Sequence, residues 1–317
     1  MTIGASGTVE AIGRGYRGTE DYWRIRQLLV DTHRSTPAGL NWEIRRWDGW
    51  YWTDAEGGRN RGEARSDVRL WETADGRLVG AVCGESAAAA HLQVHPDFRF
   101  LEAEMLSWAE GHLAGRTAEG QRQLHTRALD GDEPRLRLLR ERDYQPTWGE
   151  ACRRMRIDPH RLPEASPVAG YRLRGLRPRD VRDYRRIADV LNAGFGRTCH
   201  TAGEFAALTG SPLFRADLHL MAEAADGSCA AFVGLAVDEA NRFGIVEPVC
   251  THPGHRRRGL AAALIREGIR RIAALGATVL TLDTGDDPAA NALYEAVGFT
   301  EVHHGHVHRR LLGDRPR

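Results

Sequence analysis

The stretch VCTHPGHRRRGLAAALI, residues 249–265, decides how this chain is interpreted. The run that leads into it is apolar and β-branched, which predicts a strand, and Pro248 marks a bulge or an edge because proline cannot donate to a sheet. The apolar residues from 260 to 275 recur at helical spacing, and Gly276 stands where a helix stop belongs. A strand, an Arg/Gly turn and a helix bring free backbone N–H groups to the positive end of a helix dipole, and this combination binds phosphate. Gly259 lets such a ligand approach the backbone closely.

Composition narrows the functional classes. The chain has 317 residues, enough for two domains, and its formal net charge of +1 argues against a protein dedicated to nucleic acid or to a membrane surface. The five cysteines are widely spaced, so neither a disulfide framework nor a zinc ribbon is expected. The chain has no run of about 18 apolar residues, and its N-terminus lacks the apolar core of a signal peptide. We therefore expect a soluble, cytoplasmic protein that acts as a monomer or a homodimer.

The two halves of the chain follow one plan. The stretch HLQVHPDFRFLEAEML, residues 91–106, shares with the arginine stretch a His-Pro, two further residues, an arginine and an apolar helix. The two His-Pro pairs are 157 positions apart. An Asp-Gly between alternating apolar runs predicts a hairpin in each half, at Asp75-Gly76 and at Asp226-Gly227. A strand and a helix follow in both halves, so the sequence indicates a duplicated domain.

A linker separates the copies. Residues 159–170 hold three prolines and few large apolar side chains, which is typical of a connection between domains. The predicted domains are therefore residues 1–158 and residues 171–317. Each copy mixes helices with strands, which predicts an α/β (α+β mixed) class. In the second copy an opening helix is expected to place Val181 and Tyr184 on one apolar face.

Two motifs of the second half resemble those of a known family. Arg256-x-x-Gly259-x-Ala261 resembles the acyl-CoA pyrophosphate motif of the GNAT superfamily of N-acetyltransferases. The run Asn291-Ala-Leu-Tyr294-Glu-Ala-Val-Gly-Phe resembles the second motif of that family. The resemblance implies two tandem GNAT-like domains, each a mostly antiparallel mixed sheet flanked by helices, as in proteins similar to mycothiol synthase. It also implies acetyl-CoA as co-substrate, with no metal.

The resemblance assigns roles to residues of the second half. Strand backbone near Val249 and Thr251 is expected to pair with the pantetheine arm, and the turn after it to take the pyrophosphate. Tyr294 matches the tyrosine that protonates the leaving thiolate, since its phenol pKa of about 10 lies close to that of a thiol. The residues expected to hold acetyl-CoA are Val249, Cys250, Thr251, Arg256, Arg257, Arg258, Gly259, Leu260, Ala261 and Asn291.

Plainer interpretations of these residues stay open. The three arginines are also compatible with a solvated basic turn, and Tyr294 with a core aromatic residue. Asn291 is compatible with a helix cap or a solvent-facing side chain. Cys250 is either a reactive thiol or a small buried filler, and burial is the commoner use of free cysteine.

Glu247 is the candidate general base. It lies on the strand that leads to the turn, two residues before Val249, so a regular strand would place both side chains on one face. The alternatives are that Glu247 forms an ion pair within the protein or contacts the ammonium group of the substrate.

Three histidines near the end of the sequence alternate in the run HHGHVHRR, residues 303–310. A strand would place His304, His306 and His308 on one face, at a spacing poorly suited to one zinc ion. We expect no metal here, and interpret the run as an ordinary surface strand or as part of the lining of the substrate site.

The first half looks like a degenerate copy. Glu102 stands where the second half has Gly259, so a side chain replaces the bare amides that a pyrophosphate needs. Leu139 stands at the position of Tyr294. The run NWEIRRWDGWYW, residues 41–52, holds four tryptophans, which form either a packing cluster or an aromatic wall for the acceptor.

The sequence therefore favours a tandem N-acetyltransferase with one working acetyl-CoA site. It would transfer the acetyl group to a primary amine of a small molecule by direct attack, without nucleic-acid or membrane partners. The alternatives are acetylation of a protein N-terminus or an aminoglycoside, and an acyl-CoA-binding sensor without turnover.

Overall fold

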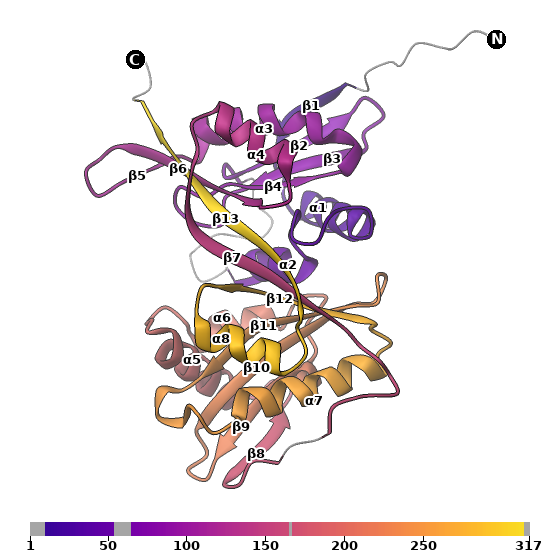
Figure 1. Cartoon of the computed structure of the whole chain (residues 1–317), viewed down its shortest axis with the longest axis vertical. Helices are drawn as coiled ribbons and strands as arrows, with labels where there is room; N and C mark the ends of the chain where they lie inside the picture. The colour runs from indigo at the N-terminus through magenta and orange to yellow at the C-terminus, as the bar shows by residue number, and fades with distance from the viewer. Residues whose placement is uncertain (1–9, 54–64, 165–166, 314–317) are drawn as a thin grey trace, which may run out of the picture. The chain divides into compact units, whose positions relative to one another are not determined.

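The computed structural model describes residues 10–53, 65–164 and 167–313. Helices and strands are labelled in Figure 1, and the chain divides into two compact units. Unit 1 comprises residues 1–42, 62–148 and 306–317. Unit 2 comprises residues 43–61 and 149–305.

Unit 1 is built on an antiparallel sheet with the strand order β1-β2-β3-β4. Its elements are β1 (Ala11–Gly15), α1 (Thr19–Thr32), β2 (Val68–Thr73), β3 (Leu78–Cys83), β4 (His91–Val94), α3 (Glu102–His112), β5 (Gly115–Arg116), β6 (Arg122–Leu129) and α4 (Glu133–Glu141). Trp71, Met105 and Leu124 are fully buried in its core. The predicted hairpin joins β2 to β3 through Gly76, whose φ of 81° a side chain would oppose.

Unit 2 contains the strand order β7-β12-β11-β10-β9-β8, in which only β11 and β12 run parallel. Its further elements are α2 (Ile44–Thr53), β8 (Tyr171–Gly175), α5 (Val181–Phe195), α6 (Ala202–Leu208), β9 (His219–Ala224), β10 (Cys229–Asp238), β11 (Phe243–Thr251), α7 (Leu260–Ala274), β12 (Val279–Gly285) and α8 (Pro288–Ala296). The second predicted hairpin joins β9 to β10 at Gly227. Helix α5 forms as expected, but Val181 at its first turn is half exposed and lies outside the core.

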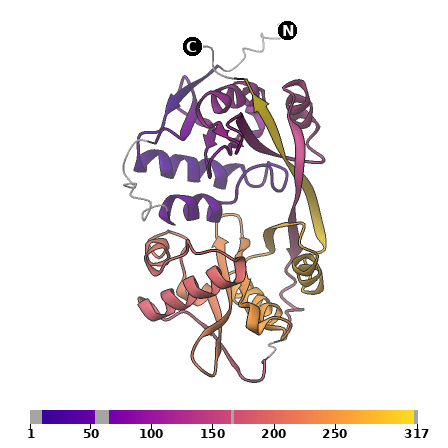
Figure 2. The same cartoon turned by 90° about the vertical axis from the view of Figure 1, so that its left-hand side faces the viewer.

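Helices cover both faces of the unit 2 sheet (Figure 2). On one face, α7 and α8 pack through residues such as Leu264, Ile269 and Tyr294. On the other face, α5 and α6 pack through Ile187 and Phe205. These two apolar cores are separate, so each β11 side chain packs on one face of the sheet or on the other. The face on which a β11 side chain lies decides which residues it can contact.

Two strands are shared between the units, and the predicted domain limits of 1–158 and 171–317 therefore differ from the compact units. Strand β7 (Gln145–Arg156) begins in unit 1 and ends in unit 2, and β13 (Glu301–Leu312) begins in unit 2 and ends in unit 1. Helix α2 also belongs to unit 2 although its sequence lies in the first half. A repeat in sequence records the order of elements, whereas the sheet that a strand joins depends on hydrogen bonds to distant segments. Among the helices that the structure describes, none has the length and apolar character needed to cross a membrane.

Candidate active site

Strands β11 and β12 part in the middle of the unit 2 sheet. Their parallel pairing runs from Phe243 opposite Val279 to Ile245 opposite Thr281, and both strands continue beyond it. Beyond Ile245, β11 keeps its antiparallel partner β10 on one edge, as far as Thr251. The other edge of β11 then faces the gap between the strands, where backbone amides and carbonyls can pair with an extended ligand.

A bulge reverses the expected side of Glu247. The register with β10 shifts between Leu235, which pairs with Val246, and Val233, which pairs with Val249, so Glu247 and Pro248 together stand opposite one residue of β10. Val246 and Val249 both pack in the core under α7. The prediction that Glu247 shares a face with Val249 is therefore wrong, because it assumed strict alternation; Glu247 points to the face of α5 and α6. The predicted bulge at Pro248 is present.

Three carboxylates and one guanidinium meet near this point. Glu43 immediately precedes α2, Glu247 lies on β11 and Asp283 lies on β12. Burial, followed by the negative charges of Asp283 and Glu247, raises the pKa of Glu43 to about 8, against the opposing charge of Arg46. The guanidinium of Arg46 lies 3.9 Å from the carboxylate of Asp283. We call Glu43, Glu247 and Asp283 the acidic group. It combines negative charge with a carboxyl group that titrates near neutral pH.

Helix α2 brings Glu43 and Arg46 to unit 2 because its apolar face packs against α6. Trp52 packs against the core beneath α5 and α6, and a Cβ on Gly210 would lie 2.6 Å from its ring. The Ser211 hydroxyl donates to Asp48 at 3.2 Å. These contacts favour packing as the role of this end of the tryptophan run. Sequence reasoning noticed the tryptophans and overlooked the charged residues between them, although the pattern E-x-x-R in NWEIRR places Glu43 and Arg46 one helical turn apart.

The arginine turn forms the predicted strand–turn–helix. Gly259 has φ 76° and is the N-cap of α7, and a Cβ there would meet no heavy atom within 4 Å. The first turn of α7, which Leu260 begins, has no side-chain cap, so its backbone N–H groups are left for another acceptor. Arg257 also has a positive φ, of 63°. An anion with several oxygens would find bare amides and the positive end of a 15-residue helix at this place.

Two arginines of this turn are held by neighbours within unit 2. Arg256 donates to the carbonyl of Gly194 at 2.9 Å, and Arg258 donates to the Tyr171 hydroxyl at 2.9 Å. Tyr171 also hydrogen-bonds to His255 at 2.8 Å. Arg256, Arg257 and Arg258 are all exposed, so their charges remain available to an anion. Tyr171 and His255 were not predicted as site residues, since nothing in the sequence indicates that β8 approaches the turn.

The other predicted acetyl-CoA residues occupy different environments. Val249 is partly buried under α7, and Thr251 pairs with Ala231 of β10. Cys250 is 4% exposed, donates to the carbonyl of Val190 at 3.2 Å, and has a pKa raised to about 11 by burial. Its thiol is thus a buried filler rather than a reactive group. Leu260 is buried and Ala261 partly buried at the start of α7.

Tyr294 lies on α8 with its side chain 8% exposed and its ring 6.2 Å from that of Phe299. Burial and the charge of Asp287 raise the pKa of Tyr294 to about 12. The raised pKa keeps its hydroxyl protonated at neutral pH. Both sequence interpretations of this residue, core aromatic and proton donor, fit this position.

Asn291 cross-links secondary structure. Its amide oxygen accepts from Arg153 at 2.8 Å, and its amide nitrogen donates to the carbonyls of Gly285 and Asp287 at 2.9 Å each. These bonds fix α8 to β7 and to the end of β12. The structure favours this positioning role over a direct contact with acetyl-CoA.

In unit 1 the place of the phosphate turn is occupied by an ion-pair network. Glu102 is 3% exposed and accepts from Arg99 at 2.7 Å and from Arg135 at 2.9 Å. Arg99 also donates to Asp132 at 2.7 Å. Burial alone would raise the pKa of Glu102, but Arg135 and Arg99 hold it below its usual value. The carboxylates of Glu102 and Asp132 therefore pair with the arginines that would otherwise bind an anionic ligand at this turn.

The edge of β4 is occupied as well. The Asn41 amide donates to the carbonyl of Val94 at 2.9 Å and accepts from its N–H at 3.0 Å. Val94 lies in the repeat where unit 2 has Thr251. A side chain thus takes the backbone bonds that an extended ligand would make, which agrees with the predicted degeneracy of this half.

The histidine run lies in β13, which both units share. His306 contacts Asp130 at 2.8 Å, and His308 is buried with its imidazole close to the carbonyl of His306. Among the residues that the structure describes, no group of three or more His, Cys, Asp or Glu side chains is arranged to hold a metal ion.

Comparisons with known proteins agree with this architecture. Residues 186–299 match the Acetyltransferase (GNAT) family. A stretch of 102 residues is 39% identical to a mycothiol acetyltransferase of Mycobacteroides abscessus, and it covers 31% of this chain and 33% of that relative. The chain thus spans about a third of the length of this relative.

Two solved structures resemble nearly the whole chain. One is a GCN5-related N-acetyltransferase from Sphaerobacter thermophilus, with 21% identity, a TM-score of 0.64 and 95% of each chain covered. The other is a tandem GNAT protein from the clavulanic acid biosynthesis pathway, with 15% identity, a TM-score of 0.65, and 97% of this chain and all of that chain covered. At these identities the likeness shows the fold, which is the tandem GNAT fold.

Proposed function

Because residues 186–299 match the Acetyltransferase (GNAT) family and the fold is similar to that of a tandem GNAT protein, we propose that unit 2 transfers an acetyl group from acetyl-CoA to a primary amine of a small molecule. One observation carries the proposal. Strand β11 has the acidic group beside it where it parts from β12, and the open turn at Gly259 follows its end. An amine and a phosphate-bearing donor can therefore lie along the same strand.

Acetyl-CoA would supply the acyl thioester. The amides around Gly259 and Leu260, with Arg256, Arg257 and Arg258, would hold its pyrophosphate. The free edge of β11 near Val249 and Thr251 would pair with its amide-bearing arm. The fit rests on the unfilled space at Gly259 and on the positive end of α7.

We propose that Glu43, beside Glu247, takes the proton of the amine. Burial and the charges of Asp283 and Glu247 raise the pKa of Glu43 to about 8, so this carboxyl group exchanges its proton near the pH of the cell. The negative charge of the acidic group would bind the ammonium form of the amine. Asp283, held beside Arg46, completes the negative surface that attracts the amine.

Tyr294 is the proposed donor of the proton that the departing thiolate needs. Its raised pKa keeps the hydroxyl protonated, and no described side chain competes for that hydrogen. The buried ring fixes where the hydroxyl lies, which reduces the orientation cost of the transfer.

The proposed acceptor is a small molecule, in keeping with the printed name of the mycothiol acetyltransferase relative. Acetylation of a protein N-terminus or of an aminoglycoside, and acyl-CoA sensing without turnover, are the alternatives. Residues 1–158 would form a degenerate GNAT-like domain, and 171–317 the catalytic domain. We also propose a cytoplasmic location and a monomer or homodimer.

The test is a screen of primary amines with the full chain, in which free thiol released from acetyl-CoA is measured. An acyltransferase that uses the acidic group releases thiol with cationic small-molecule amines, and Glu247→Gln lowers that rate. If acetyl-CoA binds but every amine in the screen, an N-terminal peptide and an aminoglycoside included, leaves the thiol signal at background, the sensor alternative holds.

A further inference from the structure

The side chain of Arg153 is buried in unit 2, although it carries a positive charge. Arg153 lies on β7 opposite Leu282 of β12 and is 9% exposed. Its Nε donates to the side-chain oxygen of Asn291 at 2.8 Å, and its Nη1 donates to the carbonyl of Phe299 at 3.1 Å. Both acceptors are neutral, and among the residues that the structure describes no carboxylate forms an ion pair with Arg153. Burying a charge without a counter-charge costs free energy, so stability alone does not account for an arginine at this position.

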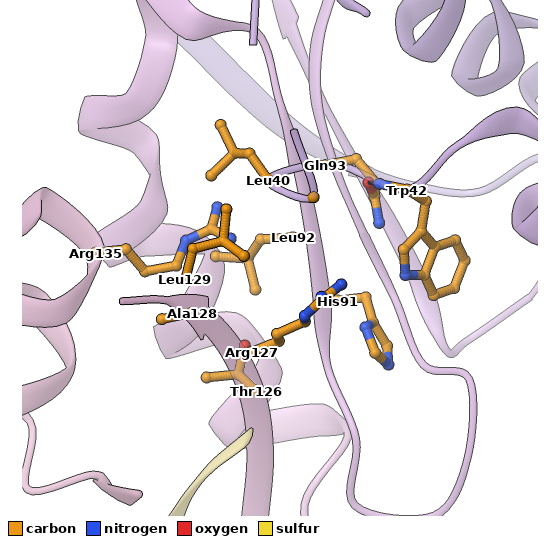
Figure 3. A pocket seen from close by; sticks show the side chains of 11 residues that line it. Leu40, Trp42, His91, Leu92, Gln93, Thr126, Arg127, Ala128, Leu129 and Arg135 are labelled. Atoms are coloured by element: carbon orange, nitrogen blue, oxygen red, sulfur yellow. Dashed lines mark hydrogen bonds between the residues drawn. The ribbon is translucent and has the colours of Figure 1, made fainter. Parts of the chain in front are cut away.

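The buried arginine of unit 1 is placed differently. Arg135 lies on α4 and lines a pocket of unit 1 together with Leu92 and Leu129 (Figure 3). Its guanidinium forms an ion pair with Glu102 at 2.9 Å. A counter-charge thus accompanies the buried guanidinium of unit 1, whereas that of unit 2 binds an amide oxygen and a backbone carbonyl. The planar fork of an arginine can hold two such acceptors in fixed directions.

The two acceptors of Arg153 lie on either side of Tyr294 in the chain. Asn291 is one helical turn before Tyr294 on α8, and Phe299 follows the end of that helix. The backbone N–H of Phe299 donates to the carbonyl of Tyr294 at 3.0 Å, and the rings of these two residues are 6.2 Å apart. One guanidinium therefore holds both the helix before the tyrosine and the segment after it.

A second side chain of β7 supports the same region. Met155 lies two residues after Arg153, on the same face of the strand, and packs against the apolar core that contains Tyr294 and Phe299. A Cβ on Gly298, which has φ 111°, would lie 3.3 Å from the methyl group of Met155. The end of α8 thus packs closely against the face of β7 that presents Arg153.

Unit 1 lacks the matching side chains. The offset of 155 positions that places Leu139 at the position of Tyr294 also places Leu136 at that of Asn291. Leu139 is buried in the core of unit 1, and Leu136 packs against that core. The copy without the tyrosine therefore also lacks the polar side chain that Arg153 binds in unit 2. This joint difference is expected if the bond between Arg153 and Asn291 serves the tyrosine.

We propose that Arg153 is a positioning residue, which holds Tyr294 where its hydroxyl can give a proton to the departing thiolate. The inference rests on the role proposed above for Tyr294. Arg153 acts through Asn291 and Phe299 and has no contact of its own with the substrates. The rate of proton transfer falls when the donor is displaced, because donor and acceptor must come within hydrogen-bond distance.

The first measurement is the turnover of Arg153→Lys, which keeps the charge but replaces the fork with a single ammonium group. We expect kcat to fall at least about 10-fold, while the Kd of acetyl-CoA stays within about 2-fold. In a Tyr294→Phe chain the same substitution should lower kcat by less than about 2-fold, because the group that Arg153 positions is already absent. Arg156→Lys changes an exposed arginine of the same strand; it is the matched control and should alter neither quantity.

The second measurement does not depend on turnover. In the full chain labelled with ¹³C at the tyrosine Cζ, the Tyr294 signal is the one missing from Tyr294→Phe. In the wild type it should remain that of a protonated phenol at about pH 10.5, since burial and the charge of Asp287 raise the pKa of Tyr294 to about 12. In Arg153→Lys the loosened ring meets water, and its signal should titrate at lower pH. If this difference is present but no amine is acetylated, the proposed function fails while the positioning of Tyr294 by Arg153 holds.

Three results would overturn the proposal. Wild-type kcat in Arg153→Lys would show that Tyr294 needs no such support. An equal fall in kcat with and without Tyr294 would mean that Arg153 acts on another group. An unchanged titration of the Tyr294 signal would show that the ring does not depend on the arginine. If Arg153→Lys does not fold, Arg153→Gln, which keeps a donor without the charge, takes its place under the same limits.

Discussion

The guanidinium of Arg46 on α2 lies 3.9 Å from the carboxylate of Asp283 on β12. The two residues come from opposite halves of the sequence, yet both belong to unit 2. The relationship means that the first half contributes charged groups to the site of the second half, in addition to forming a domain of its own. The proposed chemistry therefore depends on α2 as well as on β11.

The free energy of unfolding should fall as pH rises between about 4.5 and 8, because of Glu43. Its pKa is raised from 4.5 to about 8 in the folded chain, so the folded state binds this proton more tightly than the unfolded state across that window. Glu43→Gln removes the titration and should raise the melting temperature at pH 8, with little change at pH 4.5. Denaturation at several pH values checks this, with the exposed Glu239→Gln as control. A Glu43→Gln chain with the wild-type pH slope would contradict the assignment.

The same substitution should change the pH dependence of turnover. If Glu43 accepts the proton beside Glu247, Glu43→Gln lowers kcat/KM by at least about 10-fold and shifts the ascending limb of the pH profile. Acetyl-CoA affinity should stay unchanged. An unaltered profile in Glu43→Gln, together with a large loss in Glu247→Gln, would make Glu247 the sole base.

Tyr294→Phe should lower kcat by roughly 100-fold while leaving acetyl-CoA affinity within about 2-fold, because only the proton donor is lost. The measurement is steady-state thiol release beside calorimetric binding. Tyr184→Phe is the control, since Tyr184 is also a buried tyrosine of unit 2 and packs on the opposite face of the sheet. Wild-type turnover in Tyr294→Phe would leave Tyr294 a packing residue.

A fragment of residues 165–317 should aggregate or unfold. It lacks β7, which pairs with β12 from Arg156 opposite Val279 to Glu150 opposite Gly285. It also lacks α2, which covers the apolar surface of α6 through Trp52. Circular dichroism and size-exclusion chromatography against the full chain test this. A soluble, active fragment would show that the shared strand is dispensable.

Local patterns in the sequence predicted local structure well. Asp-Gly pairs marked both hairpins, and the arginine stretch predicted a strand, a turn and α7. These features depend on backbone preferences of a few neighbouring residues. Glu102 corresponds in the repeat to Gly259, and this difference also predicted that the turn of unit 1 is filled. A side chain at a position where a pyrophosphate needs bare amides blocks the turn locally, so the sequence alone reveals it.

Features that depend on distant segments were not predictable in the same way. Strands β7 and β13 each extend from one unit into the other, and the spacing of residues in the sequence does not indicate this. The bulge at Glu247 and Pro248 reverses a side chain through one shift of register with β10, while the alternation pattern in sequence stays the same. Glu43 was missed because its importance comes from Asp283 and Glu247, which the fold brings near it.

The central claim is that one acetyl-CoA binds per chain, at the turn that Gly259 opens. Calorimetric titration of the full chain with acetyl-CoA tests it most directly. We predict one site per chain, and no detectable binding in Gly259→Glu, where a carboxylate would occupy the open space before α7. Gly276→Glu is the matched control, because Gly276 lies just beyond the other end of α7 with a similar φ of 84° and equally open space; it should bind like the wild type. Two comparable sites, or retained affinity in Gly259→Glu, would contradict the account.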